Sequence, residues 1–225
     1  MNHRAAYPDL ESILSTARFG TYAAWAASDR ERAVALYTLN AQLSECFYLP
    51  LQMLEVALRN RIDSVLRDVA GETWFDRAEY HANPRQPDML AKARQDLTDA
   101  RKDPTPGAIV AALTLGFWTA MLGKEYENIW QTDLHRIARR ADGKGLRRKD
   151  FTRPLGPLRL LRNRVAHHEP ILHWDLRKHH AALLELTGWL SPVAADWCRD
   201  QSRFAAIYPA EGVGLAVIDA EDEQA

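Results

Sequence analysis

Cysteine is scarce in this chain of 225 residues, and its two copies, Cys46 and Cys198, form no CxxC pair. This scarcity argues against a disulfide framework or a zinc knuckle as the basis of the fold. The first residues, MNHRAAYPDLES, also lack the apolar run of a secretion signal. We therefore expect a protein of a reducing compartment, the cytoplasm.

Alternating apolar and polar runs joined by hairpin turns are missing as well, and apolar residues recur instead at helical spacing. We therefore expect an all-α protein. A helix beginning near Pro8 opens the chain, and a long helical pattern follows from Asp29 to Gly71, kinked or broken at Pro50. The later predicted elements are a loop with a short helix over 72–90, helices over 87–102, 106–123, 125–140, 158–168 and 174–190, a last helix from 191, and a basic connection over 142–157.

No linker clearly divides the chain. Residues 1–208 are predicted to form a single helical domain, and residues 209–225 an acidic, disordered tail that ends in DAEDEQA.

Residues 104–123 carry no charge, which raises the alternative of a membrane helix. A span needs about 20 mainly apolar residues. This segment contains two Pro, three Gly and three Thr, so a core helix that starts after Pro106 is favoured.

Positive charge is concentrated in one segment. Residues 136–164 hold eleven Lys or Arg against Asp142 and Asp150, which gives this segment a charge of +9 and the remainder −10 in a chain whose net charge is −1. Such a segment suits phosphate binding, because neutralising the backbone supplies most non-specific affinity for nucleic acids. The alternative is an ordinary solvated surface.

The stretch LLRNRVAHHEP, residues 160–170, places Arg162, Asn163 and His167 in one short helix. Leu158, Leu161 and Val165 form its expected buried stripe, which turns Asn163 and His167 to the opposite side. Pro170 disfavours helical geometry at the residue before it, so the helix should end near 167–168.

These residue types suit chemistry on a phosphate. His167 can take or give a proton near neutral pH, and Arg162 offers a forked, permanently charged donor to phosphate oxygens. Asn163 would orient either the imidazole or the phosphate. His168 is ambiguous, since it could also be a packed residue or a favourable charge at the end of the helix.

The histidine-rich segment also has to be compared with two other kinds of site. Five of the eight histidines, His167, His168, His173, His179 and His180, fall within fourteen residues and could suggest a metal site. There is no HExxH pattern and no thiolate nearby, so we expect no metal and no cofactor. A Ser-His-Asp hydrolase is disfavoured because no nucleophile-elbow sequence is present.

The stretch LLRNRVAHHEPI resembles the signature of the Abi-like (abortive infection) proteins of the HEPN ribonuclease superfamily, an Arg and a polar residue followed after three positions by a His. LEVALRNRID at 54–63, with Glu55, Arg59 and Asn60, resembles that family's N-terminal signature, and GAIVAALTLGFWTAML resembles its central helix. The resemblance implies a single helical-bundle domain of the HEPN type, with extra helices. It also implies a metal-independent endoribonuclease of a defence or toxin system that acts as a dimer.

On this resemblance the catalytic residues would be Arg162, Asn163 and His167. The supporting or RNA-binding residues would be His168, Glu169, Arg59, Asn60, Arg147, Arg148 and Lys149. Glu55 and Arg59 could alternatively be an ordinary helix ion pair.

The expected partners are RNA, a second copy of the chain, and an antitoxin or defence-system protein, with no membrane. The long helices over 29–70 and the uncharged helix over 104–123 are the expected subunit interface. The alternative is a non-catalytic RNA-binding or protein-interaction module of the same fold.

Overall fold

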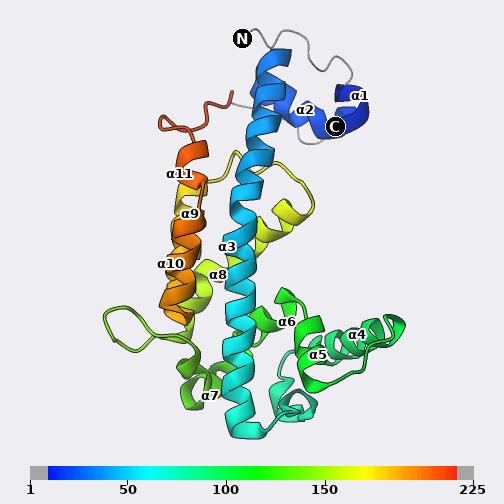
Figure 1. Cartoon of the computed structure of the whole chain (residues 1–225), viewed down its shortest axis with the longest axis vertical. Coiled ribbons are helices and arrows are strands. Elements are labelled where there is room, and N and C mark those ends of the chain that lie inside the picture. Colours follow the sequence, from blue (N-terminus) through cyan, green and yellow to red (C-terminus); the bar gives the residue numbers. More distant parts are fainter. Residues whose placement is uncertain (1–9, 217–225) are drawn as a thin grey trace. The chain divides into compact units, whose positions relative to one another are not determined.

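The computed structural model describes residues 10–216 (Figure 1). Within that range every regular element is a helix, so the all-α prediction is confirmed. The HEPN type of bundle stays a prediction. The expected helix start near Pro8 and the last part of the expected tail, residues 217–225, lie outside the described residues.

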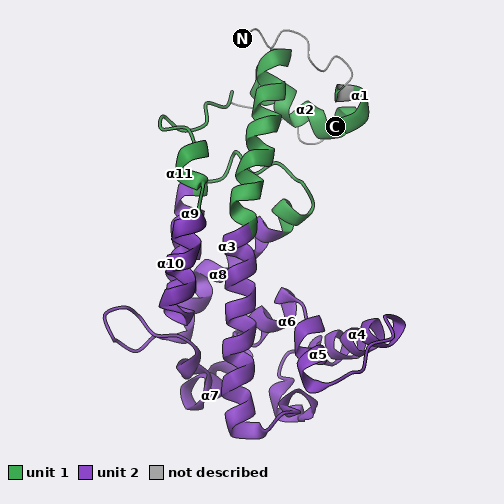
Figure 2. Ribbon diagram, viewed as in Figure 1, with its two compact units in different colours: residues 1–48, 163–176, 202–225 green, residues 49–162, 177–201 purple. Residues whose placement is uncertain are grey.

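The chain divides into two compact units, each assembled from separated segments (Figure 2). The first unit comprises residues 1–48, 163–176 and 202–225, and the second residues 49–162 and 177–201. Helices α3 (Arg30–Ala70) and α8 (Arg148–Ala166) each contribute residues to both units. Since three of the four divisions fall inside helices rather than in linkers, the composition of the sequence does not mark them.

Aromatic side chains fill the first unit. Its helices are α1 (Leu10–Leu14), α2 (Thr16–Trp25), the first part of α3, the end of α8, and α11 (Phe204–Ile207). Tyr22 is buried between Trp25 and Tyr37, which meet its ring edge-on at 5.6 and 5.2 Å. Burial raises the pKa of the Tyr22 phenol.

The first predicted helix is interrupted at Ser15, whose φ of 68° is left-handed. The Ser15 hydroxyl accepts the N–H of Arg18 and so caps the start of α2. At the other end of the chain, Ala216 N–H donates to the carbonyl oxygen of Trp25 at 2.9 Å. The described chain therefore continues past residue 208 and is tied to α2.

Helix α3 runs from Arg30 to Ala70 with Pro50 inside it, so a break at Pro50 is not observed. A proline removes one helical hydrogen bond and costs about 3 kcal/mol in a helix interior. Burial of Phe47, Leu51 and Leu54 on both sides of it opposes that cost. The predicted stop is confirmed, because Gly71 has a φ of 86° and its N–H donates to Arg67 O.

The second unit holds most of the remaining helices. They are the 3-10 turns η1 (Trp74–Asp76), η2 (Ala78–Tyr80), η3 (Lys124–Tyr126) and η4 (Leu134–Ile137), and the helices α4 (Gln86–Asp99), α5 (Pro106–Ala112), α6 (Leu115–Ala120), α7 (Glu127–Thr132), α9 (Leu176–Leu190, from its second residue) and α10 (Pro192–Gln201). The helix expected over 125–140 is thus three short pieces.

The uncharged segment forms two helices, because Thr114 is extended, with a ψ of 162°, between α5 and α6. Its aromatic residues enter the core, where Trp118 lies 5.2 Å from Phe117 and 6.1 Å from Trp74, measured between ring centroids. All three rings are fully buried in the chain itself. These aromatic side chains therefore belong to the core of the chain, and the subunit interface expected on this segment stays a prediction. No helix within residues 10–216 combines the length and apolar character that crossing a membrane requires.

Helix α8 begins at Arg148, ten residues earlier than the sequence predicts, and contains Pro154 and Pro157. The basic connection is therefore shorter than expected. Phe151, Leu155, Leu158 and Leu161 form a buried stripe along the helix, while Val165 is only half-buried. This continuous stripe explains why packing overrides two prolines in one helix.

Candidate functional site

The motif helix ends in a hydrogen-bonded turn that fixes the main chain around His167 and His168. Glu169 N–H donates to Arg164 O at 2.8 Å, and His168 N–H donates to Val165 O at 3.2 Å. His168 has a φ of 57°, so this is a Schellman ending with His168 in the position that usually takes glycine. Helix α8 stops at Ala166, which agrees with the predicted end within a residue.

A buried asparagine on α3 holds the segment that follows. Asn40 is 4% exposed, and its side-chain oxygen accepts the N–H of Ile171 at 2.8 Å. Its amide nitrogen donates to Glu169 O at 3.4 Å. Arg18 of α2 donates to His168 O at 3.3 Å. The turn is therefore positioned by two other helices of the first unit.

Arg164 also serves this turn. Its guanidinium donates to Pro170 O at 3.0 Å, lies 3.8 Å from the Glu169 carboxylate, and stands 5.4 Å above the ring of Trp174. Sequence reasoning missed Asn40 and Arg164. The signal for Asn40 was available, since it stands in helical register with the apolar residues Leu36, Leu43 and Phe47.

His167 is exposed, and within residues 10–216 no hydrogen bond or ion pair to its imidazole is seen. Its main-chain N–H donates to Asn163 O at 2.9 Å, and the Asn163 side chain is half-buried. His167 is therefore a solvent-facing imidazole on a fixed main chain, which is a suitable arrangement for proton transfer to a bound substrate.

In the second unit, Arg162 lies 3.5 Å from the Glu55 carboxylate of α3. Their side chains are 39% and 24% exposed. Arg59 instead donates to the side chain of the neighbouring Asn60 at 3.2 Å. Glu55 therefore pairs with Arg162 of another helix and not with Arg59. Residues from the two predicted signatures thus meet in this unit.

The three basic residues expected to face RNA lie in different environments. Arg147 is exposed and pairs with Asp150 at 2.7 Å, and this hydrogen bond lowers the pKa of that carboxyl. Lys149 is exposed. Arg148 is 7% exposed and donates to Glu127 at 2.6 Å and to Leu122 O at 2.8 Å. Arg148 is therefore a structural residue, and we remove it from the expected RNA-facing set.

The described histidines and cysteines do not form a metal-binding group. Within residues 10–216 no group of three or more His, Cys, Asp or Glu is arranged to hold a metal ion. Burial lowers the pKa of His180 and raises the pKa of the Cys46 and Cys198 thiols. The two thiols are thus poor nucleophiles.

No family model, curated protein or solved structure matches the chain. The family resemblance drawn from the motifs therefore stays a prediction.

We expect Arg148→Ala to lower the stability of the protein, whereas Arg147→Ala should leave it nearly unchanged. Loss of Arg148 leaves the Leu122 carbonyl without its donor, which costs about 1–3 kcal/mol. The measurement is urea unfolding followed by circular dichroism. Equal stability of the two variants would contradict the structural role of Arg148.

The hydrogen bond from Arg148 lowers the pKa of Glu127. A carboxyl whose folded pKa is lowered stabilises the fold above its ordinary pKa, and loses that effect as the pH falls through the lowered value. The difference in the free energy of unfolding between wild type and Arg148→Ala should accordingly become smaller at acidic pH.

Proposed function

We propose that this protein is a metal-independent endoribonuclease of a defence or toxin type, in which His167 transfers protons and Arg162 binds the phosphate. One observation carries the proposal: the imidazole of His167 faces solvent on a turn whose main chain is held by Asn40 and Arg18. A residue needed only for packing would be buried. The motif resemblance supplies the class of reaction.

The proposed reaction needs only proton transfer and stabilisation of charge on the phosphate. The 2′-hydroxyl of the RNA attacks the adjacent phosphorus, the bond to the 5′ oxygen breaks, and the products carry a 2′,3′-cyclic phosphate and a 5′-hydroxyl. His167 takes the proton from the 2′-hydroxyl or gives one to the leaving oxygen. Arg162 stabilises the charge that develops on the phosphate.

Glu55 has a positioning role in this proposal. A guanidinium has five N–H donors, and one carboxylate at 3.5 Å occupies only part of them. The pair orients Arg162 while its 39% exposure leaves donors open to solvent. A partly exposed pair of this kind is screened by solvent and contributes little to stability, so a phosphate can compete for the arginine.

The other predicted site residues have lesser parts. Asn163 orients the imidazole or the phosphate, while Arg59 and Asn60 support the surface near Glu55. His168 and Glu169 serve the turn through their main chains. Arg147 and Lys149 give the RNA backbone a basic surface.

We expect His167→Ala to abolish cleavage of total cellular RNA while the protein stays folded. Loss of a positioned acid or base costs about 10²–10⁴ in rate. His168→Gly is the matched control, because glycine suits the left-handed position and the main-chain contacts remain. It should keep its activity. Cleavage by His167→Ala at the wild-type rate, or by no variant on any RNA, would favour the non-catalytic binding module.

Arg162→Lys tests the second role with charge conserved. A lysine offers a point charge and does not reproduce the fork of an arginine, so we expect cleavage to be largely lost. The assay is the same, with circular dichroism as the check on folding. Near-normal cleavage would remove Arg162 from the site.

The ends of the products identify the mechanism. We expect 5′-hydroxyl and 2′,3′-cyclic phosphate ends, and activity that persists in EDTA, because attack by the 2′-hydroxyl needs no metal-activated water. Mapping of RNA ends after brief incubation gives the answer. Products with 3′-hydroxyl and 5′-phosphate ends would reject the mechanism.

We expect the active form to be a homodimer. In-line attack uses one group that accepts a proton and another that donates one, and each chain offers one well-placed candidate, His167. A two-fold axis would supply the second. Leu160 is 53% exposed on α8, two positions before Arg162, and offers an apolar contact beside the motif.

Light scattering should give twice the chain mass for wild type, and one chain mass with no cleavage for Leu160→Glu. Val193→Glu on α10 is the control, since Val193 is 79% exposed and away from the motif in sequence. An active wild-type monomer would refute the shared site.

A further inference from the structure

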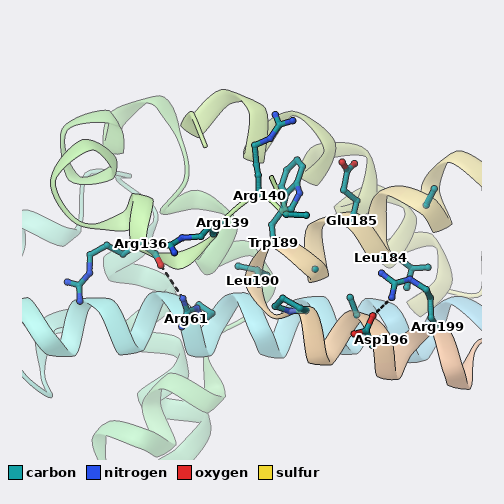
Figure 3. Close-up of a pocket in the computed structure, with 15 residues that line it drawn as sticks. Arg61, Arg136, Arg139, Arg140, Leu184, Glu185, Trp189, Leu190, Asp196 and Arg199 are labelled. Carbon is teal, nitrogen blue, oxygen red and sulfur yellow. Dashed lines mark hydrogen bonds and ion pairs between the residues drawn. The ribbon is translucent and has the colours of Figure 1, made fainter. Parts of the chain in front are cut away.

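The second unit contains a cavity of about 920 Å³ with an apolar floor and a cationic wall (Figure 3). Helices α9 and α10 supply Leu184, Trp189, Leu190 and Ala195, and the segment after η4 supplies Arg139 and Arg140. This combination of aromatic, apolar and cationic groups differs from an ordinary solvated surface. It suits a ligand with a flat apolar part and a negative charge.

A second cavity of about 970 Å³ adjoins it and is more strongly basic. The two share Arg61, Arg136 and Arg139. The second cavity also has Lys144 and Arg147 in its wall, and Asp68 is its one acidic lining residue. The second cavity therefore has five cations against one carboxylate, while the first also has Glu185 and Asp196 in its wall.

The cations that line these two cavities differ in the groups that they already bind. Arg61 donates to Ile137 O at 3.0 Å and to Arg136 O at 3.1 Å, which fixes η4 against α3. Arg136 pairs with Asp68 at 2.9 Å and Arg140 with Asp142 at 3.3 Å, all on exposed side chains. Exposed pairs contribute about 0–1 kcal/mol, so an anionic ligand can displace them.

Arg139 is the best-placed cation. It lines both cavities, and its main-chain N–H donates to Trp189 O at 2.8 Å, so its backbone is fixed against that of Trp189. Within residues 10–216 no ion pair to its guanidinium is seen. Arg139 thus offers a positive charge with no carboxylate partner, and it lines both the apolar and the basic cavity. A phosphate bound there would make strong charge-assisted hydrogen bonds to it.

We propose that the two neighbouring cavities together bind a nucleoside carrying a phosphate or diphosphate. The base packs against Trp189 and Leu190, the phosphates lie on Arg139 with Arg136 and Lys144, and Glu185 accepts a hydrogen bond from a base amino group or a ribose hydroxyl. Both a free nucleotide and the 5′-phosphorylated end of an RNA carry this chemistry. The proposal does not rest on ribonuclease activity, since none of its residues belongs to the catalytic motif.

The test is isothermal titration calorimetry of the full chain with ADP, adenosine and pyrophosphate. We expect ADP to bind best, and Arg139→Ala to weaken ADP and pyrophosphate about 10-fold to 100-fold, the range for a lost charge-assisted hydrogen bond. Arg153→Ala is the matched control, because it removes an exposed arginine of α8 that lines neither cavity. It should change nothing.

Trp189→Leu distinguishes the contribution of the base from that of the phosphates. It should weaken ADP and leave pyrophosphate unchanged. The Trp189 ring also lies 6.2 Å from the Phe151 ring, measured between centroids, so the melting temperature of this variant is measured as a check on folding. The result for Arg139→Ala does not depend on the Trp189→Leu variant. Equal affinity for ADP and pyrophosphate in wild type, no binding of ADP at millimolar concentration, or wild-type binding by Arg139→Ala would each overturn the proposal.

A trinucleotide with 2′-O-methyl riboses identifies the source of the ligand, since it cannot be cleaved through its 2′ oxygen. Displacement of ADP by the 5′-phosphorylated form but not by the 5′-hydroxyl form supports an RNA end. ADP binding that neither form displaces supports a free nucleotide. Binding of ADP by a protein that cleaves no RNA would uphold this site and contradict the ribonuclease.

Discussion

The paired hydrogen bonds of the Asn40 side chain are the interaction on which the candidate site depends. Where α8 stops, no strand or helix follows at once to satisfy the main chain, and an unsatisfied buried N–H or C=O costs about 1–3 kcal/mol. One amide satisfies Ile171 N–H and Glu169 O together from a position that is itself buried. Arg18 and Arg164 then bind the carbonyls of His168 and Pro170. These hydrogen bonds hold the turn through its main chain, so the turn does not depend on a contact of the exposed His167 side chain.

Arginine has three separate uses in this protein. Arg61, Arg148 and Arg164 bind main-chain carbonyls, and they stabilise turns and helix ends where a short element needs partners. Arg162 pairs with a half-buried carboxylate and keeps part of its donors open. Arg139 has its side chain at the surface of a cavity. Net charge alone cannot tell these uses apart, because each guanidinium carries the same charge while burial and partners decide whether a ligand can reach it.

The sequence predicted the helical class, the stop at Gly71 and the end of α8, since each follows from local signals: apolar spacing, a glycine after the helix, and a proline two residues past the turn. It did not predict that α3 continues through Pro50 or that α8 begins at Arg148, because there tertiary burial of Phe47, Leu51 and Phe151 outweighs local propensity. Arg162 and His167 were proposed as site residues from their spacing, and that role stays a prediction. The partner of Arg162, Glu55, was suspected of pairing with Arg59, since helical spacing cannot reveal a contact from another helix.

Burial of both cysteines has a practical consequence. Cys46 and Cys198 are the only thiols of the chain, they are 8% and 1% exposed, and burial keeps their pKa values raised. Alkylating reagents and disulfides attack the thiolate, so both should react slowly. A cysteine introduced on an exposed position would therefore be the one fast-reacting thiol, available for a spectroscopic probe or a cross-link without first removing the native ones.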